Sequence, residues 1–163
     1  MPRSRADIAN TATRIFLQEF GATYDEMRDL PRYVRANHFE EVKEFFGHTC
    51  CYCGTELVPG HVDQDHLIPL NQTALGLHAW GNIVPSCSPC NRLKRERRWQ
   101  DFVQERAGFS TAERIDRINE FVEHYRYAPP FDLRAATADL YVEVGNVAMA
   151  LIQTKIERTK AAG

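Results

Sequence analysis

Two C-x-x-C pairs enclose an Asp-His dipeptide near the middle of this chain. The four cysteines are Cys50, Cys53, Cys87 and Cys90, and the dipeptide between them is Asp65-His66. Each pair lets two thiolates from one tight turn bind a single ion, and four such thiolates typically form a closed tetrahedral zinc site. Because protein ligands would then fill every coordination position, we expect the zinc ion to be structural and the chemistry to lie elsewhere.

Asp65, His66 and Asn91, which directly follows Cys90, are the polar side chains that such a zinc site would draw together. A carboxylate and an amide offer the oxygen ligands that magnesium prefers, and a neutral imidazole with an ordinary pKa near ~6.5 can take a proton from water. Phosphodiester hydrolysis needs this combination of a divalent ion and a base. Successive side chains of a regular strand point to opposite faces, so the strand is expected to end, twist or bulge at Asp65-His66.

The composition favours a cytoplasmic protein of one domain, with or without helical extensions. The chain has 163 residues, and all five cysteines lie between positions 50 and 90. Metal-bound thiolates in a reducing compartment fit this clustering best, with two disulfides or free buried thiols as the alternative. Cys51, the fifth cysteine, is expected to be a small buried hydrophobe. Residues 1–10 lack the apolar region of a signal peptide, and no stretch is expected to reach the length and apolarity of a membrane span.

A basic run follows Asn91 directly. It contains Arg92, Lys94, Arg95, Arg97 and Arg98 with only Glu96 of opposite sign, whereas the whole chain has a formal net charge of −2. Any positive face is therefore confined to this patch. On a helix that continues through the run, Lys94, Arg97 and Arg98 project on or beside the face of Asn91. We expect them to neutralise nucleic-acid phosphates, and the alternative is a solvated helix face.

Hydrophobic periodicity predicts five helices, separated by glycine or proline. Their expected ranges are residues 4–20, ending at Gly21; about 31–46, ending at Gly47; about 90–107, ending at Gly108; a helix capped by Ser110 and Glu113; and about 132–160. Recurrent glycines and prolines between 48 and 89 favour short strands, expected at 57–58, 61–68 and 83–84. The last helix carries an apolar seam that is most simply core, with a two-helix contact in a homodimer as the alternative. This seam consists of Leu140, Val144, Val147, Leu151 and Ile152.

With these residues in view, the segment from about Thr49 to Arg98 resembles the HNH endonucleases of the ββα-metal class, in their form with four zinc-binding cysteines. The resemblance rests on four blocks in order: Cys50-Cys51-Tyr52-Cys53-Gly54, Asp63 to Leu70, Gly81 to Pro85, and Cys87 to Lys94. It implies an α+β fold with a ββα-metal core and two zinc knuckles in a mainly helical frame. Three parts are expected: N-terminal helices at 1–47, the nuclease core at 48–107 and C-terminal helices at 108–163, packed as one globular unit.

The resemblance also implies a role for each residue of the motif. Asp65 is a ligand of a catalytic divalent ion, His66 is the general base and Asn91 is the second ligand. Asn82 ties together the loop between strand and helix. The implied cofactors are Zn²⁺ as the structural ion and Mg²⁺ or Mn²⁺ as the catalytic ion, because an asparagine at the last position keeps an oxygen donor.

The sequence therefore predicts a metal-dependent endonuclease that cuts double-stranded DNA. The main alternative is a non-catalytic zinc-bearing module that binds nucleic acid, which would need the cysteines and arginines but not Asp65, His66 and Asn91 together. A secreted nuclease toxin is a third possibility. Restriction, homing, phage DNA processing and repair are all open as biological settings.

Overall fold

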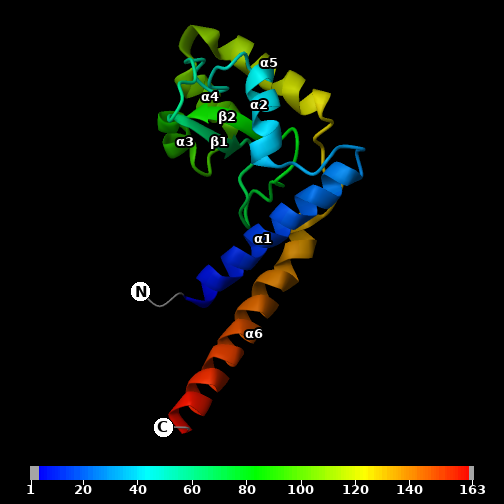
Figure 1. The fold of residues 1–163 in the computed structure, drawn as a ribbon, viewed down its shortest axis with the longest axis vertical. Helices are drawn as coiled ribbons and strands as arrows, with labels where there is room; N and C mark the ends of the chain where they lie inside the picture. Colours follow the sequence, from blue (N-terminus) through cyan, green and yellow to red (C-terminus); the bar gives the residue numbers. More distant parts are fainter. Residues whose placement is uncertain (1–3, 162–163) are drawn as a thin grey trace.

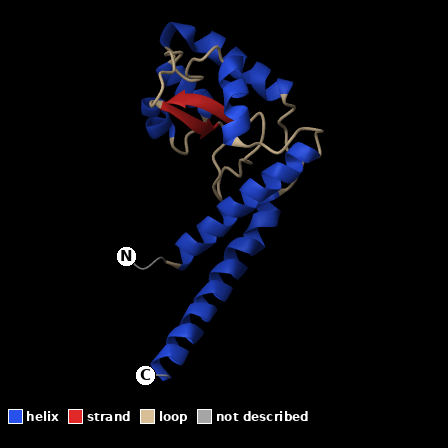
Figure 2. Ribbon diagram, viewed as in Figure 1, coloured by secondary structure: helices blue, strands red, loops and turns tan. Residues whose placement is uncertain are grey.

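A computed structural model describes residues 4–161 of the chain, which form a mainly helical molecule around one small sheet (Figures 1 and 2). The elements in order are α1 (Arg5–Glu26), α2 (Arg35–Phe45), β1 (Val62–His66), β2 (Ile83–Cys87), α3 (Ser88–Lys94), α4 (Trp99–Arg106), a 3-10 turn (Gly108–Ser110), α5 (Thr111–His124) and α6 (Leu133–Ala161). This arrangement confirms the predicted α+β class. Residues 1–3, at the start of the segment analysed for a signal peptide, lie outside the described residues.

The two strands and the helix that follows them form a ββα unit. β1 and β2 are antiparallel, with Val62 opposite Cys87 and His66 opposite Ile83, and α3 begins directly after β2. The long connection between the strands is held by the buried amide of Asn82. This amide accepts a hydrogen bond from the Ile68 N–H (2.8 Å) and donates to the carbonyls of Ile68 (3.0 Å) and Leu77 (2.8 Å). Asn82 therefore ties the loop together, as the resemblance implies.

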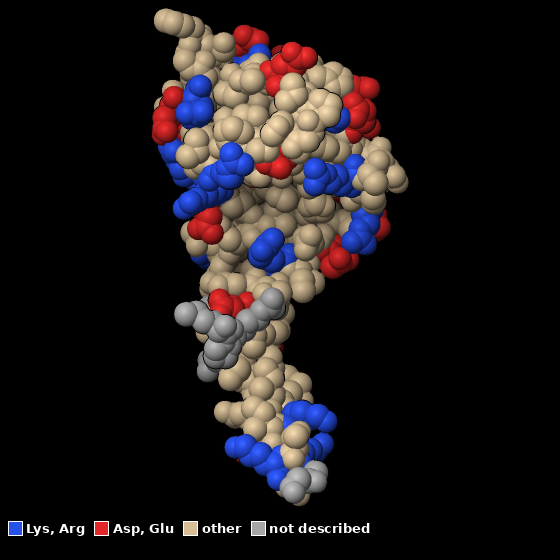
Figure 3. All heavy atoms as spheres, turned by 60° about the vertical axis from the view of Figure 1, so that its left-hand side comes forward, with Lys and Arg blue, Asp and Glu red and all other residues tan. Residues whose placement is uncertain are grey.

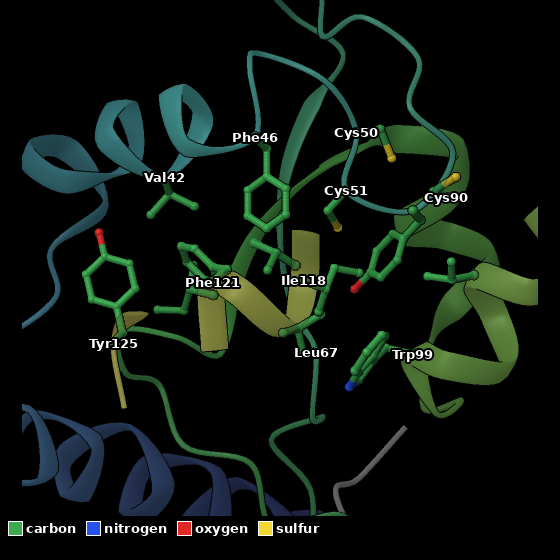
Figure 4. Close-up of a cluster of buried hydrophobic side chains, with 14 of the residues drawn as sticks. Val42, Phe46, Cys50, Cys51, Leu67, Cys90, Trp99, Ile118, Phe121 and Tyr125 are labelled. Carbon is green, nitrogen blue, oxygen red and sulfur yellow. The ribbon is translucent and has the colours of Figure 1, made fainter. Parts of the chain in front are cut away.

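The main hydrophobic core lies between the sheet, α2 and α5. Figure 4 shows Val42 and Phe46 from the region of α2 facing Ile118 and Phe121 of α5. Cys51 belongs to the same cluster and is fully buried, which confirms the expectation that it packs as a small hydrophobe. Because α2 and α5 flank the ββα unit in sequence, this core joins segments on both sides of the unit into one packed body.

Helices α1 and α6 lie side by side in opposite directions and project from this packed body (Figure 1). α6 extends beyond the start of α1, and its apolar seam is largely exposed: Val147, Leu151 and Ile152 are 45–65% accessible. The reading of this seam as core is therefore wrong for these three residues, whereas Leu140 and Val144 are half-buried. By length and composition α6 could also cross a membrane, a criterion that core helices of soluble proteins meet too, and 12% of its most apolar stretch is buried. The expectation that no segment reaches this length and apolarity is wrong as well.

Several predicted helix boundaries differ from the structure for identifiable reasons. α1 continues through Gly21, because the glycine serves close packing and not termination: a Cβ there would lie 2.3 Å from the carbonyl oxygen of His78. The helix expected at 90–107 is two helices, interrupted at Arg95, whose φ is +49°. Ser110 lies in a 3-10 turn and makes no side-chain cap. The segment 57–58 forms no strand, and its neighbour Glu56 makes only an isolated bridge to Thr49.

The buried carboxylate of Asp25 anchors the end of α1 to the rest of the fold. It accepts hydrogen bonds from the guanidinium of Arg28 (2.5 Å) and from the backbone N–H groups of Trp80 (3.1 Å) and Tyr33 (3.3 Å). Burial raises the pKa of Asp25 to about 6, even though the adjacent Arg28 lowers it. Asp25 thus joins the end of α1 and the turn that follows it to the distant segment at Trp80.

Replacement of this carboxylate should destabilise the whole fold. We expect Asp25→Ala to lower the free energy of unfolding at pH 7.5 by about 3–5 kcal/mol, because it leaves Arg28 buried without its counter-charge. Glu19→Ala is the matched control, since Glu19 lies on the same helix but forms an exposed ion pair with Arg32. It should cost less than about 1 kcal/mol. Urea denaturation measures both, and equal losses for the two variants would contradict this role for Asp25.

Candidate functional site

The four cysteines of the C-x-x-C pairs converge on one point. The sulfur atoms of Cys50, Cys53, Cys87 and Cys90 all lie within 4.8 Å of one another, and the Sγ atoms of Cys53 and Cys87 are 3.9 Å apart. Tetrahedral coordination with Zn–S distances of about 2.3 Å separates the sulfurs by about 3.8 Å. All five cysteines are free thiols, so disulfides are not formed. The cluster is therefore arranged to bind a metal ion, and its dimensions fit zinc.

The proton chemistry of the cluster also favours a cation. A hydrogen bond with Cys50 and burial raise the pKa of Cys90 well above its usual range, and burial followed by the charge on Cys50 raises the pKa of Cys87 to about 11. The hydrogen bond from Cys90 lowers the pKa of Cys50 itself to about 5. Four thiolates cannot coexist here without positive charge between them. A bound divalent ion would supply that charge and take the place of the protons.

Asp65 and His66 are the last two residues of β1, and their side chains take different directions. The Asp65 carboxylate accepts hydrogen bonds from the Tyr52 hydroxyl (2.7 Å) and from the backbone N–H of His66 (2.8 Å). The His66 ring instead faces His78, with 3.0 Å between Nε2 of His66 and Nδ1 of His78. The strand ends here, as predicted, so both side chains reach the same cleft without a bulge.

The environment of His66 keeps its ring neutral. Burial, and then the positive charges of His78, Lys94 and Arg14, lower the pKa of His66 to about 3. The pKa of His78 is lowered too, mainly by burial. A neutral imidazole is the form that can accept a proton, and a bound phosphate anion would raise its basicity.

Lys94 lies inside the protein and not on its surface. Its side chain is fully buried, with Nζ 2.6 Å from the carbonyl oxygen of His66 and 3.2 Å from the Asp65 carboxylate. The prediction that Lys94 contacts DNA phosphates is therefore wrong. Lys94 does lie one helical turn after Asn91 on α3, but its side chain turns inward to the end of β1. The helical spacing fails only for Arg97 and Arg98, because α3 ends at Lys94 and the chain turns at Arg95. The ammonium group instead binds the end of β1 through the His66 carbonyl and the Asp65 carboxylate.

The remaining predicted site residues lie outside the cleft that Asp65 and His66 share. Asn91 is on α3, half-buried, and its amide has no hydrogen-bond partner among residues 4–161. Asn82 supports the loop and does not line the cleft. The other basic residues of the run, Arg92, Arg95, Arg97 and Arg98, are exposed, and Arg97 pairs with Glu105.

The cleft has a volume of about 560 Å³ and is lined by Asp65, His66 and His78 together with residues of α1 and of the loop that follows β1. His78, whose ring is hydrogen-bonded to that of His66, is a cleft residue that the sequence analysis did not identify. The sequence analysis also assigned no role to Tyr52, which lies inside the first C-x-x-C turn and is therefore fixed by the cysteines on either side. The position of Tyr52 between Cys50 and Cys53 is the sequence feature that could have identified it.

Loss of one cysteine should remove the metal and destabilise the fold. We expect Cys87→Ser to abolish zinc binding and to lower the melting temperature, because the metal links the two ends of the 50–90 segment. Cys51→Ser is the matched control, since Cys51 is buried nearby but lies outside the cluster. It should keep the metal. Native mass spectrometry counts the ion, and a folded Cys87→Ser protein with full zinc content would refute the assignment.

The interior position of Lys94 leads to a separate test. Lys94→Met keeps the length of the side chain but leaves the Asp65 carboxylate without its counter-charge, so we expect a loss of several kcal/mol in the free energy of unfolding. Arg98→Ala, at an exposed position of the same basic run, should change stability by less than about 0.5 kcal/mol. A Lys94→Met protein as stable as the parent in urea would show that the buried pair contributes little.

Comparison with known proteins gives one match. The family model described as HNH endonuclease matches residues 50–97, which contain both C-x-x-C pairs, β1, β2 and α3. No curated protein and no solved structure matches the chain. The matched segment includes Asp65, His66, Asn82 and Asn91, and its ββα geometry agrees with the resemblance seen in the sequence. The chain therefore carries an HNH endonuclease domain at residues 50–97.

Proposed function

We propose that this protein is a metal-dependent endonuclease that hydrolyses phosphodiester bonds in double-stranded DNA. The observation that carries the proposal is the position of Asp65 and His66, adjacent at the end of β1 in the HNH domain and lining one cleft. A carboxylate and a neutral imidazole at one site are what metal-assisted attack of water on a phosphate requires.

His66 is proposed as the general base. In the tautomer in which its Nε2–H donates to Nδ1 of His78, the lone pair on Nδ1 of His66 is free to accept a proton from water. His78 would thus fix the orientation of the ring. Lys94 and Tyr52 would fix the neighbouring carboxylate by their contacts with Asp65.

Asp65 and Asn91 are proposed to hold the catalytic divalent ion, Mg²⁺ or Mn²⁺. Their side chains offer oxygen donors only, which suits these hard ions, and the Asn91 amide is not committed to another partner among the described residues. When bound, such an ion supplies charge neutralisation on the phosphate and on the leaving 3′ oxygen. The four-cysteine cluster is proposed to hold a separate, structural Zn²⁺.

Substitutions should separate the base from the ligands. We expect His66→Ala to abolish nicking of supercoiled plasmid while metal content and folding remain unchanged, because only the proton acceptor is lost. Asp65→Ala and Asn91→Ala should also lose cleavage, but raised magnesium or manganese should partly restore it. Gel analysis of plasmid across a series of metal concentrations measures all three.

The control for this experiment is His61→Ala. His61 is exposed just before β1 and lies outside the cleft, so its loss should leave the cleavage rate unchanged. Cleavage at the parent's rate by His66→Ala would exclude the proposed mechanism. A wild-type protein that binds DNA but never cuts it with magnesium or manganese would favour the non-catalytic nucleic-acid-binding module.

A further inference from the structure

One wall of the cleft comes from α1, outside the segment that matches the HNH family. Asn10, Arg14 and Gln18 line the cleft, and their spacing of four residues places them on one face of the helix. They lie across from Asp65 and His66. The catalytic segment and the helix before it therefore build a single cleft between them.

Arg14 supplies the positive charge of this wall, and it forms no ion pair with a carboxylate of residues 4–161. The side chain of Arg14 makes no hydrogen bond or ion pair with residues 4–161, whereas those of Arg28, Arg97 and Arg117 are each paired with a carboxylate. Arg14 lines the same cleft as His66 and Asp65. An unpaired guanidinium beside the reaction site is suited to contact a phosphate.

The position of Arg14 is fixed by the way α1 docks. Gly21 lies two turns further along the same face, where its backbone meets His78, and the N–H of His78 donates to the carbonyl of Leu17 (3.3 Å). His78 in turn contacts the ring of His66. The seven residues from Arg14 to Gly21 span roughly 10 Å of helix. Because a helix is rigid over this length, the contact at Gly21 also determines where Arg14 lies.

The charges of the cleft indicate on which side an anion would bind. The lining also includes two carboxylates, Asp65 and Glu96, and the neutral polar residues Asn71, Gln72 and Thr73. Arg14 is the positive charge on the α1 side. Figure 3 shows the surface hollowed where the globular part meets the projecting helices, with Lys and Arg side chains around the hollow.

We propose that the α1 wall is a binding site for a nucleic-acid strand, in which Arg14 contacts a backbone phosphate next to the one that is cut. Asn10 and Gln18 donate and accept hydrogen bonds with sugar or base edges on either side. The identity of the cut phosphate rests on the proposed nuclease function, whereas the strand-binding site itself does not. The basic run after Asn91 is a weaker candidate for this contact, because Lys94 is buried, Arg97 is paired with Glu105, and none of the arginines of the run lines the cleft.

Salt titration of DNA binding tests the contact with the phosphate. In the cleavage-deficient His66→Ala protein, Arg14→Ala should reduce the magnitude of the slope of log affinity against log salt by about 0.9 for a short duplex. The loss of affinity between 50 and 200 mM salt should then be smaller by a factor of about 3.5. Arg14→Lys should restore the slope, because it keeps the charge. Fluorescence anisotropy with several unrelated duplexes measures these values.

Two controls isolate the charge of Arg14. Asn10→Ala removes a neutral group from the same wall, so it should weaken binding without changing the salt slope. Arg117→Ala removes an arginine that is paired with Glu120 on α5, away from the cleft, and it should change neither quantity. An Arg14→Ala protein with the parent's salt slope would overturn the proposed site.

The outcome for this site can be separated from that for the nuclease. If the wild-type protein never cuts DNA but Arg14→Ala lowers the salt slope, the strand-binding site stands and the nuclease function fails. If His66→Ala abolishes cleavage while Arg14→Ala leaves the slope and KM unchanged, the nuclease stands and the α1 wall is refuted.

Discussion

The direct contact between the backbones of Gly21 and His78 sets the position of α1 on the HNH domain, and much of the site depends on it. A side chain at position 21 would collide with the His78 carbonyl, so the helix would have to move away. The carboxylate of Asp25, one turn further on, accepts hydrogen bonds from the backbone N–H groups of Trp80 and Tyr33. The segment that packs against α1 also carries His78, whose ring faces His66. Helix docking and the orientation of His66 are therefore coupled.

The Asp-His dipeptide is held from several directions by groups that are themselves buried. Tyr52 and Lys94 contact the Asp65 carboxylate, and the Lys94 ammonium also binds the His66 carbonyl. Tyr52 lies within the first cysteine turn, and Lys94 ends the helix that bears the fourth cysteine. The cluster of four cysteines thus supports the site through these two side chains.

Sequence reasoning succeeded where the determining contacts are local or imposed by a metal. The C-x-x-C spacing identified the cluster, and the resemblance to the HNH motif implied the structural role of Asn82. It failed for Lys94, because the burial of its side chain depends on a distant partner, the Asp65 carboxylate. It failed for Arg97 and Arg98, because helical periodicity was extended past Arg95, whose positive φ ends the helix. It failed for Gly21, because glycine is typical both of helix ends and of places where two backbones pack closely. Here it serves close packing against His78. The α6 seam was misread because its burial depends on how far α1 reaches, and no local pattern in the sequence marks Arg14 as part of the cleft.

Arg14 and Gly21 lie on one face of α1, so the number of residues in the interval between them determines where Arg14 lies once Gly21 is docked. Substitutions on this interval leave the helix in register, but one inserted or deleted residue would rotate one half against the other by about 100° and shift it by about 1.5 Å. Arg14 would then point away from the cleft while Gly21 stayed docked. Related chains with this architecture should therefore vary in residue type along the interval but keep its length.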